Sequence, residues 1–333
     1  MKTRCIFALV LALFSFGFAH GAKGPAVTDP AKAAEDPDFS VQGEYAASAA
    51  IGAKAKPGGY GLQVVALGDG AFQAALYAGG LPGSGTESNE FVTLKGASKE
   101  GETTLSAPSG EKVVIAGGKA TGSKNGKALF AYDRVERRSP TLGEAAPKGA
   151  AVLFDGEKGV DRFSDGKKLD GKLLKEGVVS KDSFGDFTLH LEFRTPYKPH
   201  TKPGSQDRGN SGVYIFNNYE TQVLDSFGIK GEFNFCGALY RKKAPDRNMC
   251  LPPLAWQTYD IAFTAPRFDK DGNKVKNARI TTRHNGVLIH DDFELPKGTG
   301  AGGGRPEKMK GQIHLQGHGN PVRFRNIWLV EKK

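Results

Sequence analysis

The sequence predicts an all-β protein built from sandwich or barrel domains, and three observations indicate this class. Its 333 residues include 45 glycines and 18 prolines, which interrupt helices and favour turns. No stretch keeps apolar residues at the 3.6-residue spacing of an amphipathic helix. Short runs of alternating apolar and polar residues recur instead between Gly, Pro, Asn or Asp, as is typical of antiparallel strands.

The first 21 residues have the layout of a secretory signal peptide. Lys2 and Arg4 precede an apolar run over residues 6–18, which is too short for a permanent membrane span. We therefore expect an exported protein, periplasmic or extracellular, with no membrane span. Loss of this segment would lower the net charge from +10 to +8, because it removes two cations and no acid. No recognition helix or stacking motif accompanies this charge, so we expect no nucleic-acid partner.

Three segments follow the signal peptide. Residues 22–38 are rich in Ala, Lys, Pro and Asp, a composition that predicts a disordered lead-in. Residues 39–138 carry Gly-rich turns between strand candidates and predict a small β domain. Residues 139–150 predict a linker. The strand candidates of the small domain are 61–67, 71–77, 90–94, 102–105, 112–116 and 127–132.

Residues 151–333 predict a larger β domain of two packed antiparallel sheets. Asn285-Gly286 predicts a tight hairpin, because both central residues of a type I′ turn need a positive φ. Cys236 and Cys250 remain after the signal peptide, and they either close a disulfide in an oxidising compartment or stay reduced. The clearest strands are 187–194, 212–216, 220–224, 258–264, 278–284, 286–290, 312–316 and 323–330.

The strand at residues 219–225 carries the most informative chemistry. Side chains alternate between the faces of a strand, so Glu220 and Gln222 share one face. A one-residue bulge after Gln222 would bring Asp225 to the same face. Two carboxylates and an amide on one sheet face favour a sugar-handling site.

The strand at residues 187–194 shows the same alternation of apolar and polar side chains. Its odd positions are Phe or Leu and should face the core, whereas Thr188, His190, Glu192 and Arg194 should face solvent or a cleft. We expect His190 to be an exposed strand histidine. Glu192 either belongs to the site or forms an ordinary surface ion pair with Arg194.

Other polar residues are candidates for the same site. Gln316 alternates with core positions of its strand, and glycines on both sides of His318 would allow a ligand to approach closely. Asn210 lies in a turn and either caps the backbone or contacts a ligand. Arg323 either binds an oxyanion or pairs with a carboxylate such as that of Asp225.

Taken together, these residues resemble the 3-keto-disaccharide hydrolase family over roughly residues 150–331. The resemblance implies a concanavalin-like jelly-roll sandwich that cleaves glycosides whose sugar carries a ketone at C3. The preceding segment resembles the small β domain of some exported members. The motifs that carry the resemblance are Phe154-Asp155-Gly156, Gly185-Asp186-Phe187, Leu191-Glu192-Phe193-Arg194, Gly209-Asn210-Ser211-Gly212, Tyr219-Glu220-Thr221-Gln222-Val223-Leu224-Asp225, Gly237-Ala238-Leu239-Tyr240, Trp256-Gln257-Thr258, His284-Asn285-Gly286, Gln316-Gly317-His318-Gly319 and Val322-Arg323-Phe324-Arg325.

The implied mechanism is proton removal at C2, β-elimination of the glycosidic oxygen and addition of water. It requires a base, an acid and an electrophile for the enolate. The catalytic candidates are Glu220, His318 and Glu192. The electrophile is either Arg323 or a divalent metal ion held by Glu192, Glu220 or Asp225, and no cofactor is certain. The candidates for substrate binding are Gln222, Asn210, Asp225, Arg323, Arg194, Gln316 and Trp256. The partners are an oxidised oligosaccharide or glycoside and a separate sugar 3-oxidoreductase.

Two alternatives remain open. A laminarinase-like glycosidase would use two carboxylates on one bulged strand, and Glu220-x-Gln222-x-x-Asp225 copies part of that spacing. A non-catalytic carbohydrate-binding module would use the same sandwich with exposed aromatic side chains as platforms.

Overall fold

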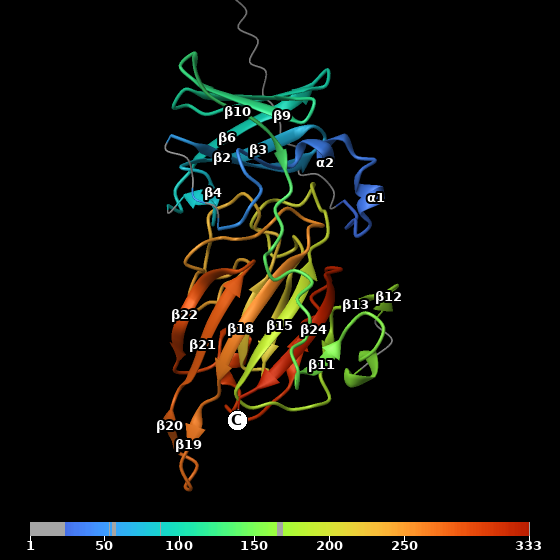
Figure 1. Ribbon diagram of the computed structural model, residues 1–333, viewed down its shortest axis with the longest axis vertical. Helices are drawn as coiled ribbons and strands as arrows, with labels where there is room; N and C mark the ends of the chain where they lie inside the picture. The colour runs from blue at the N-terminus through green and yellow to red at the C-terminus, as the bar shows by residue number, and fades with distance from the viewer. Residues whose placement is uncertain (1–23, 53, 55–57, 87, 165–168, 333) are drawn as a thin grey trace, which may run out of the picture.

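The computed structural model describes residues 24–332, except 53, 55–57, 87 and 165–168. The expected signal peptide, residues 1–21, lies outside the described residues. The chain forms a β-barrel at one end and a β-sandwich at the other (Figure 1), which confirms the predicted all-β class. None of the helices in the described part is long and apolar enough to cross a membrane.

Residues 24–38, for which the composition predicted a disordered lead-in, contain regular structure ahead of the barrel. The segment forms two short helices, α1 (Pro30–Ala33) and α2 (Pro37–Val41). Each begins with an Asp-Pro pair, in which the aspartate caps the helix and proline supplies the required φ. The composition of the segment suggested disorder, whereas these two start signals determined its structure.

The barrel closes through eight antiparallel strands in the order β1-β10-β9-β8-β7-β6-β3-β2, and all lie within the predicted segment 39–138. Closure leaves no unpaired edge, so every strand of this small sheet is hydrogen-bonded on both sides. Leu62, Leu94, Leu105 and Val113 are fully buried in its interior. The strands are β1 (Gly43–Ala46), β2 (Tyr60–Gly68), β3 (Ala71–Ala78), β6 (Val92–Lys99), β7 (Glu102–Ser106), β8 (Glu111–Ala116), β9 (Lys119–Lys124) and β10 (Lys127–Val135), and a short parallel pair, β4 (Leu81–Pro82) with β5 (Gly85–Thr86), lies beside them.

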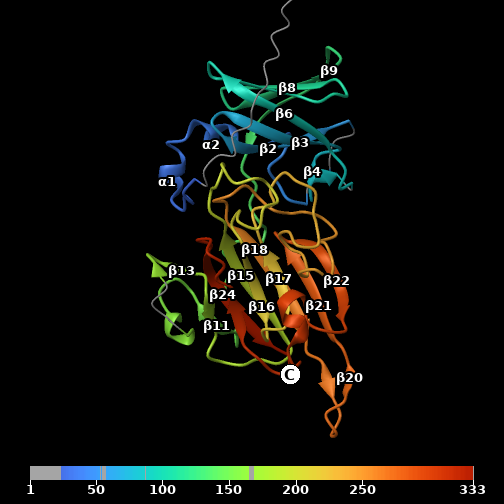
Figure 2. The same ribbon diagram turned by 180° about the vertical axis from the view of Figure 1, so that it is seen from behind.

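The sandwich has the concanavalin-like architecture of two stacked sheets. The larger sheet has the order β12-β13-β24-β15-β18-β21-β22, with β11 also paired to β24, and the smaller has the order β14-β23-β16-β17. Figure 2 views the molecule from the side on which β16 and β17 are labelled. The strands are β11 (Ala151–Phe154), β12 (Leu169–Asp170), β13 (Leu173–Lys175), β14 (Val178–Val179), β15 (Phe187–Arg194), β16 (Ser211–Ile215), β17 (Tyr219–Val223), β18 (Gln257–Thr264), β21 (Ala278–His284), β22 (Val287–Leu295), β23 (Ile313–Leu315) and β24 (Arg323–Glu331), and a projecting hairpin contains β19 (Arg267–Phe268) and β20 (Lys274–Lys276).

The sandwich core follows the predicted alternation. The odd residues of β15, from Phe187 to Phe193, have no exposed surface and pack between the sheets. The hairpin between β21 and β22 is also confirmed, since Asn285 and Gly286 both have positive φ, 50° and 77°. Polar side chains of both sheets therefore lie on their outer faces, where a site can form.

The barrel rests on loops at one end of the sandwich. Val65 of the barrel packs with the sandwich core, and an added Cβ at Gly228 would lie 2.5 Å from its Cγ2. The buried guanidinium of Arg208 pairs with Asp225 at 2.7 Å and also donates to the Ala66 carbonyl at 3.5 Å. A buried ion pair therefore lies at the junction of the two bodies.

Cys236 and Cys250 are buried free thiols, so of the two open alternatives the structure has the reduced pair. The Cys236 sulfur lies 3.3 Å from the Tyr259 hydroxyl, and the Cys250 thiol donates to the Leu224 carbonyl at 3.5 Å. Burial raises the pKa of the Cys250 thiol well above its ordinary value.

Candidate active site

A cavity of about 380 Å³ lies on the outer face of the smaller sheet. Strands β16 and β17 and the segments around them supply its walls. This volume falls within the range of about 300–1,000 Å³ that small-molecule sites occupy. Its lining residues are Asn210, Tyr214, Glu220, Gln222, Tyr240, Arg241, Gly300, Gln316 and His318.

The register of β16 and β17 sets the floor of this cavity. Tyr214 lies opposite Glu220 and Gly212 opposite Gln222, so these side chains share the outer face. The pairing runs without a shift, and the expected bulge after Gln222 is absent from it. A Cβ at Gly212 would lie 2.4 Å from the Glu220 Oε1, so the glycine makes room for the carboxyl group.

Glu220 is the buried acid of the cavity, with 2 % of its surface exposed. Burial raises the pKa of its carboxyl to about 7, and a hydrogen bond with Tyr214 offsets part of that rise. Its Oε2 has no hydrogen-bond partner among the residues that the structure describes, while its backbone N–H donates to the Thr299 hydroxyl at 2.7 Å. A carboxyl group with this pKa can both take and give a proton near neutral pH.

The side chain of Gln206 holds two amide side chains of the cavity lining in place. The Gln206 Oε1 accepts hydrogen bonds from Gln222 Nε2 at 3.0 Å and from Asn210 Nδ2 at 3.2 Å. Among the described residues, neither the Gln222 Oε1 nor the Gln316 Oε1 has a hydrogen-bond partner. Buried acceptors without donors are costly, so these oxygens suit a ligand that brings hydroxyl groups.

The rim of the cavity carries its cationic and titratable groups. His318 and Arg241 are both exposed, in contrast to the buried Glu220. The Arg241 guanidinium lies 5.5 Å from the centroid of the Tyr240 ring and makes no ion pair within the described part of the chain. A buried acid therefore faces an exposed histidine and arginine across one cavity.

Glu192 lies in a different place, on the outer face of the larger sheet. Its carboxylate accepts hydrogen bonds from Arg325 Nε and the Gly143 N–H, both at 2.6 Å, and from Asn326 at 3.0 Å. Burial raises the pKa of Glu192, but its hydrogen-bond donors, led by His190, outweigh burial and hold it at about 2. The structure therefore does not bring Glu192 to the Glu220 cavity.

His190 is fully buried, so the expectation of an exposed histidine is wrong. Its Nδ1 lies 2.6 Å from the Asp260 Oδ1, and its ring stacks on Trp328. Burial lowers the pKa of His190, but Asp260 and Glu192 together raise it to about 9. The alternation of the strand correctly places His190 on the outer face of the sheet. It does not show that the linker covers this face.

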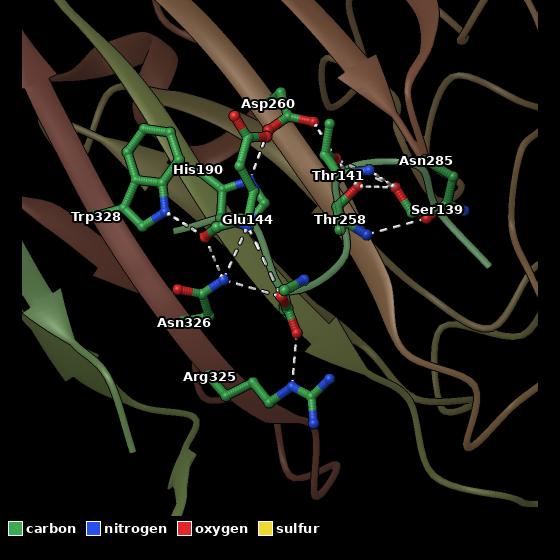
Figure 3. A network of polar contacts seen from close by, with 12 residues as sticks. Ser139, Thr141, Glu144, His190, Thr258, Asp260, Asn285, Arg325, Asn326 and Trp328 are labelled. Atoms are coloured by element: carbon green, nitrogen blue, oxygen red, sulfur yellow. Dashed lines mark hydrogen bonds and ion pairs between the residues drawn. The ribbon is translucent and has the colours of Figure 1, made fainter. Parts of the chain in front are cut away.

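The predicted linker forms part of this network (Figure 3). The Thr141 hydroxyl donates to the Asp260 Oδ2 at 2.8 Å, and the Ser139 hydroxyl lies 2.6 Å from that of Thr258. The Glu144 carbonyl accepts from the Trp328 indole at 3.2 Å. Residues 139–144 are therefore fastened along the outer face of the larger sheet.

Asp225 and Arg323 are engaged elsewhere. Asp225 pairs with Arg208 at the junction with the barrel. Arg323 pairs with Asp170 at 3.0 Å and Glu176 at 3.4 Å, so of the two alternatives the structure has the carboxylate pair, with these two acids in place of Asp225. The reason is that β17 ends at Val223, and the chain then turns towards the barrel.

Arg194 and Trp256 lie near the barrel, away from the cavity lining. Arg194 donates to the Thr28 carbonyl at 2.9 Å, and its guanidinium lies 5.0 Å from the Trp256 ring. The metal candidates Glu192, Glu220 and Asp225 do not converge either. In the described part of the chain, the acidic and histidine side chains close enough to share an ion are those of Glu144, His190 and Asp260.

Of the sequence candidates, the cavity brings together Glu220, Gln222, Asn210, Gln316 and His318. Sequence reasoning missed the residues that loops supply, namely Gln206, Tyr240, Arg241, Thr299 and Gly300. Gln206 lies in a proline-rich loop ahead of Asn210, and Tyr240 ends the motif Gly237-Ala238-Leu239-Tyr240. Only the fold shows that these loops meet at the cavity.

Comparisons with known proteins found matches for the sandwich part of the chain. The family model of the 3-keto-alpha-glucoside-1,2-lyase-like domain matches residues 149–330. A crystal structure of a candidate glycosyl hydrolase from Parabacteroides distasonis is 32% identical, covers 56% of this chain and 85% of its own, and has a TM-score of 0.50. A second candidate glycosyl hydrolase from that organism is 15% identical, covers 56% of this chain and 95% of its own, and has a TM-score of 0.41. No curated protein matches this chain.

Proposed function

Because this chain belongs to the family of the 3-keto-alpha-glucoside-1,2-lyase-like domain, we propose that it cleaves glycosides whose sugar carries a ketone at C3. The broader conclusion, a carbohydrate-active enzyme of glycosyl hydrolase type, follows from the family and from the 32% identical structure. The observation that carries the proposal is Glu220, a buried carboxyl group with a pKa of about 7 on the floor of a polar cavity.

The chemistry follows from the ketone. A carbonyl at C3 acidifies the C2 hydrogen, so a base removes that proton and leaves an enolate on C2, C3 and the ketone oxygen. The electron pair then forms the C1–C2 double bond while the C1–O bond breaks, and the departing oxygen takes a proton. Water adds its oxygen to C1 and its proton to C2, which gives net hydrolysis.

The positions of Glu220 and His318 suggest how the two proton transfers are divided. Glu220 lies at the buried floor, where the sugar ring would rest, and its ionised form is the base for C2. His318 lies at the exposed rim, where the leaving group would point to solvent, and it protonates the departing oxygen. Arg241 replaces Arg323 as the cation that steadies the enolate, because Arg241 lines the cavity.

The amides would hold the sugar. The side-chain oxygens of Gln222 and Gln316, unpartnered among the described residues, accept hydrogen bonds from ring hydroxyls, and Asn210, which Gln206 holds in place, also lines the cavity. The oxygens of Glu220, Gln222 and Gln316 also fit a hard divalent cation, which prefers such ligands. When bound, that ion would supply Lewis-acid stabilisation of the enolate oxygen.

A two-carboxylate glycosidase mechanism has less support. A retaining pair needs carboxyl groups about 5–5.5 Å apart. Glu220 is the carboxylate among the lining residues, and Asp225 is bound to Arg208. We also propose that the protein is exported, and that an enzyme class oxidising sugars at C3 supplies its substrate.

The direct test is incubation of the purified protein with a 3-keto-glucoside, with added divalent cation and with a chelator. We expect 3-keto-glucose or its 2-hydroxyglucal precursor, and no product from the same glycoside without the ketone. Cleavage of the unoxidised glycoside at an equal rate would contradict the proposal. So would the absence of product from the 3-keto-glucoside under both metal conditions.

A further inference from the structure

A second cavity, of about 440 Å³, lies where the barrel meets the sandwich. The barrel side contributes Glu44 and Arg134 of β1 and β10, and the segment after β10 contributes Arg138. The sandwich side contributes Trp256, which precedes β18, and Arg325 of β24. These two strands belong to the larger sheet, whereas the Glu220 cavity lies on the smaller sheet, so the two cavities are separate.

The arginines of this junction cavity keep unused hydrogen-bond donors. Arg325 donates to Glu192 through Nε at 2.6 Å, and its two terminal nitrogens have no hydrogen-bond partner within the described residues. Arg134 donates through Nε to the Gln42 carbonyl and lies 3.9 Å from exposed Glu136. The exposed side chain of Arg138 makes neither a hydrogen bond nor an ion pair with any described residue.

The local charge is positive after the structural pairs are set aside. The charge of Glu44 is neutralised by Arg137, because the two side chains form a buried ion pair at 2.6 Å and a second hydrogen bond at 2.7 Å. The carboxylate of Glu192 is likewise already in contact with Arg325, His190 and Asn326. Burial, together with the like charges of Arg323 and Arg325, holds the pKa of the neighbouring Arg194 below its ordinary value. The lining then keeps Arg134, Arg138 and Arg325 against the exposed carboxylate of Glu136, so an anion entering the cavity would meet more guanidinium groups than carboxylates.

The floor of the same cavity is apolar and rigid. Pro252, Pro253 and Leu254 line it next to the half-buried Trp256. The Arg325 guanidinium lies 4.0 Å from the centroid of the Trp256 ring. This contact fixes the arginine in place, and a fixed guanidinium fork loses little entropy when it binds a planar carboxylate in bidentate fashion.

We propose that the junction cavity is a binding site for an acidic saccharide, whose carboxylate pairs with Arg325 and Arg138 while its sugar ring lies on the apolar floor. A carboxylate matches the donor geometry of the arginines, and a ring with polar and apolar faces matches the mixed lining. The sugar identity rests on the carbohydrate-active family of the sandwich, and it holds whether or not Glu220 acts on a 3-keto sugar. The site would hold an acidic glycan while the other cavity remains free.

The test is a binding titration of the full-length protein with an oligogalacturonate and with a neutral gluco-oligosaccharide of equal length. We expect the acidic ligand to bind more tightly, with an affinity that falls as salt is raised. Arg138→Ala and Arg325→Lys should each weaken binding about tenfold or more, since each removes charge-assisted hydrogen bonds. The lysine variant keeps the charge beside Glu192 and so protects the fold.

Three controls separate the alternatives. Arg283→Ala removes an exposed arginine of β21 and should leave binding unchanged. Glu220→Gln alters the other cavity and should also leave it unchanged, so failure of the proposed function would not affect this result. Inorganic phosphate should compete only weakly. The proposal would be overturned if the neutral ligand bound with equal affinity, or if Arg138→Ala and Arg325→Lys bound the acidic ligand as tightly as the wild-type protein. It would also be overturned if phosphate displaced the saccharide with an affinity equal to that of the saccharide.

Discussion

Glu220 and Glu192 show why burial alone does not define a site residue. Both glutamates are at least 98 % buried, yet the pKa of one is raised to about 7 and that of the other is held at about 2. Glu192 has cationic and amide donors around it, whereas Glu220 has little besides the Tyr214 hydroxyl. The unsatisfied carboxyl is therefore the one available for proton transfer.

The pH dependence of cleavage follows from the raised pKa of Glu220. As the base it acts when ionised, so kcat/KM for a 3-keto-glucoside should rise as pH increases through about 7. Glu220→Gln should lower kcat about 100-fold or more, because it removes the base without changing the shape. Steady-state kinetics across a range of pH check the pH profile and the loss of kcat, and the exposed Glu294→Gln is the control. Wild-type activity in Glu220→Gln would contradict the assignment.

Gly212 offers a second test at the residue scale. In Gly212→Ala the new Cβ would lie 2.4 Å from the Glu220 Oε1, so the carboxyl group must move. We expect a loss of activity of about tenfold or more with the fold retained, since small displacements of a catalytic group are costly. Gly304→Ala is the matched control, because a Cβ there meets nothing within 4 Å. Equal activities of the two variants would argue against a fixed position for Glu220.

At the scale of elements, the alternation of apolar and polar residues predicted where strands lie. It did not predict which sheet each strand joins. The bounds of β15 and β21 match the prediction, and apolar residues alternate along the full length of β15. The strands β12, β13 and β14 have two or three residues each and carry too little pattern to detect. Alternation also places Glu192 and Glu220 on outer faces, but only the fold shows that these faces belong to different sheets.

The linker network gives a prediction about stability. The pKa of His190 is raised to about 9 in the folded protein, so its contribution is complete below the unfolded value near 6.5 and is lost as pH rises through 9. The free energy of unfolding should therefore fall between pH 6.5 and 9.5, by at most about 3 kcal/mol from this group. Urea denaturation at both pH values measures it.

Variants identify the group responsible for that fall. His190→Gln should remove the corresponding part of the pH dependence, because a glutamine does not titrate. His318→Gln, at an exposed position, should retain it. An unchanged pH dependence in His190→Gln would show that the imidazole is not protonated beneath the linker.

At the scale of the whole molecule, buried ion pairs lie at the junction of the barrel and the sandwich. The sequence indicated two β domains in the right order, but it could not show that Arg208 reaches Asp225 and the barrel carbonyl of Ala66. Such contacts join residues 17 and 142 positions apart, and only the folded topology brings them together. For the same reason, the sequence did not predict the junction cavity.

Removal of Arg208 should therefore destabilise the protein as a whole. Arg208→Ala leaves the Asp225 carboxylate buried without its partner, which typically costs about 3–5 kcal/mol. Chemical denaturation should show this loss, whereas exposed Arg241→Ala should change the free energy of unfolding little. A loss below about 1 kcal/mol in Arg208→Ala would mean that the pair contributes little to the junction.

The measurement that tests the central claim most directly is cleavage of a 3-keto-glucoside in D₂O with early analysis of the product. Elimination and hydration replace the C2 proton, so we predict deuterium at C2 of the 3-keto-glucose formed by the wild-type protein. Authentic product kept in the same solvent corrects for spontaneous exchange, and Glu220→Gln should form little product. Cleavage that leaves the C2 hydrogen in place would contradict the account, because the glycosidic bond would then break without proton removal at C2.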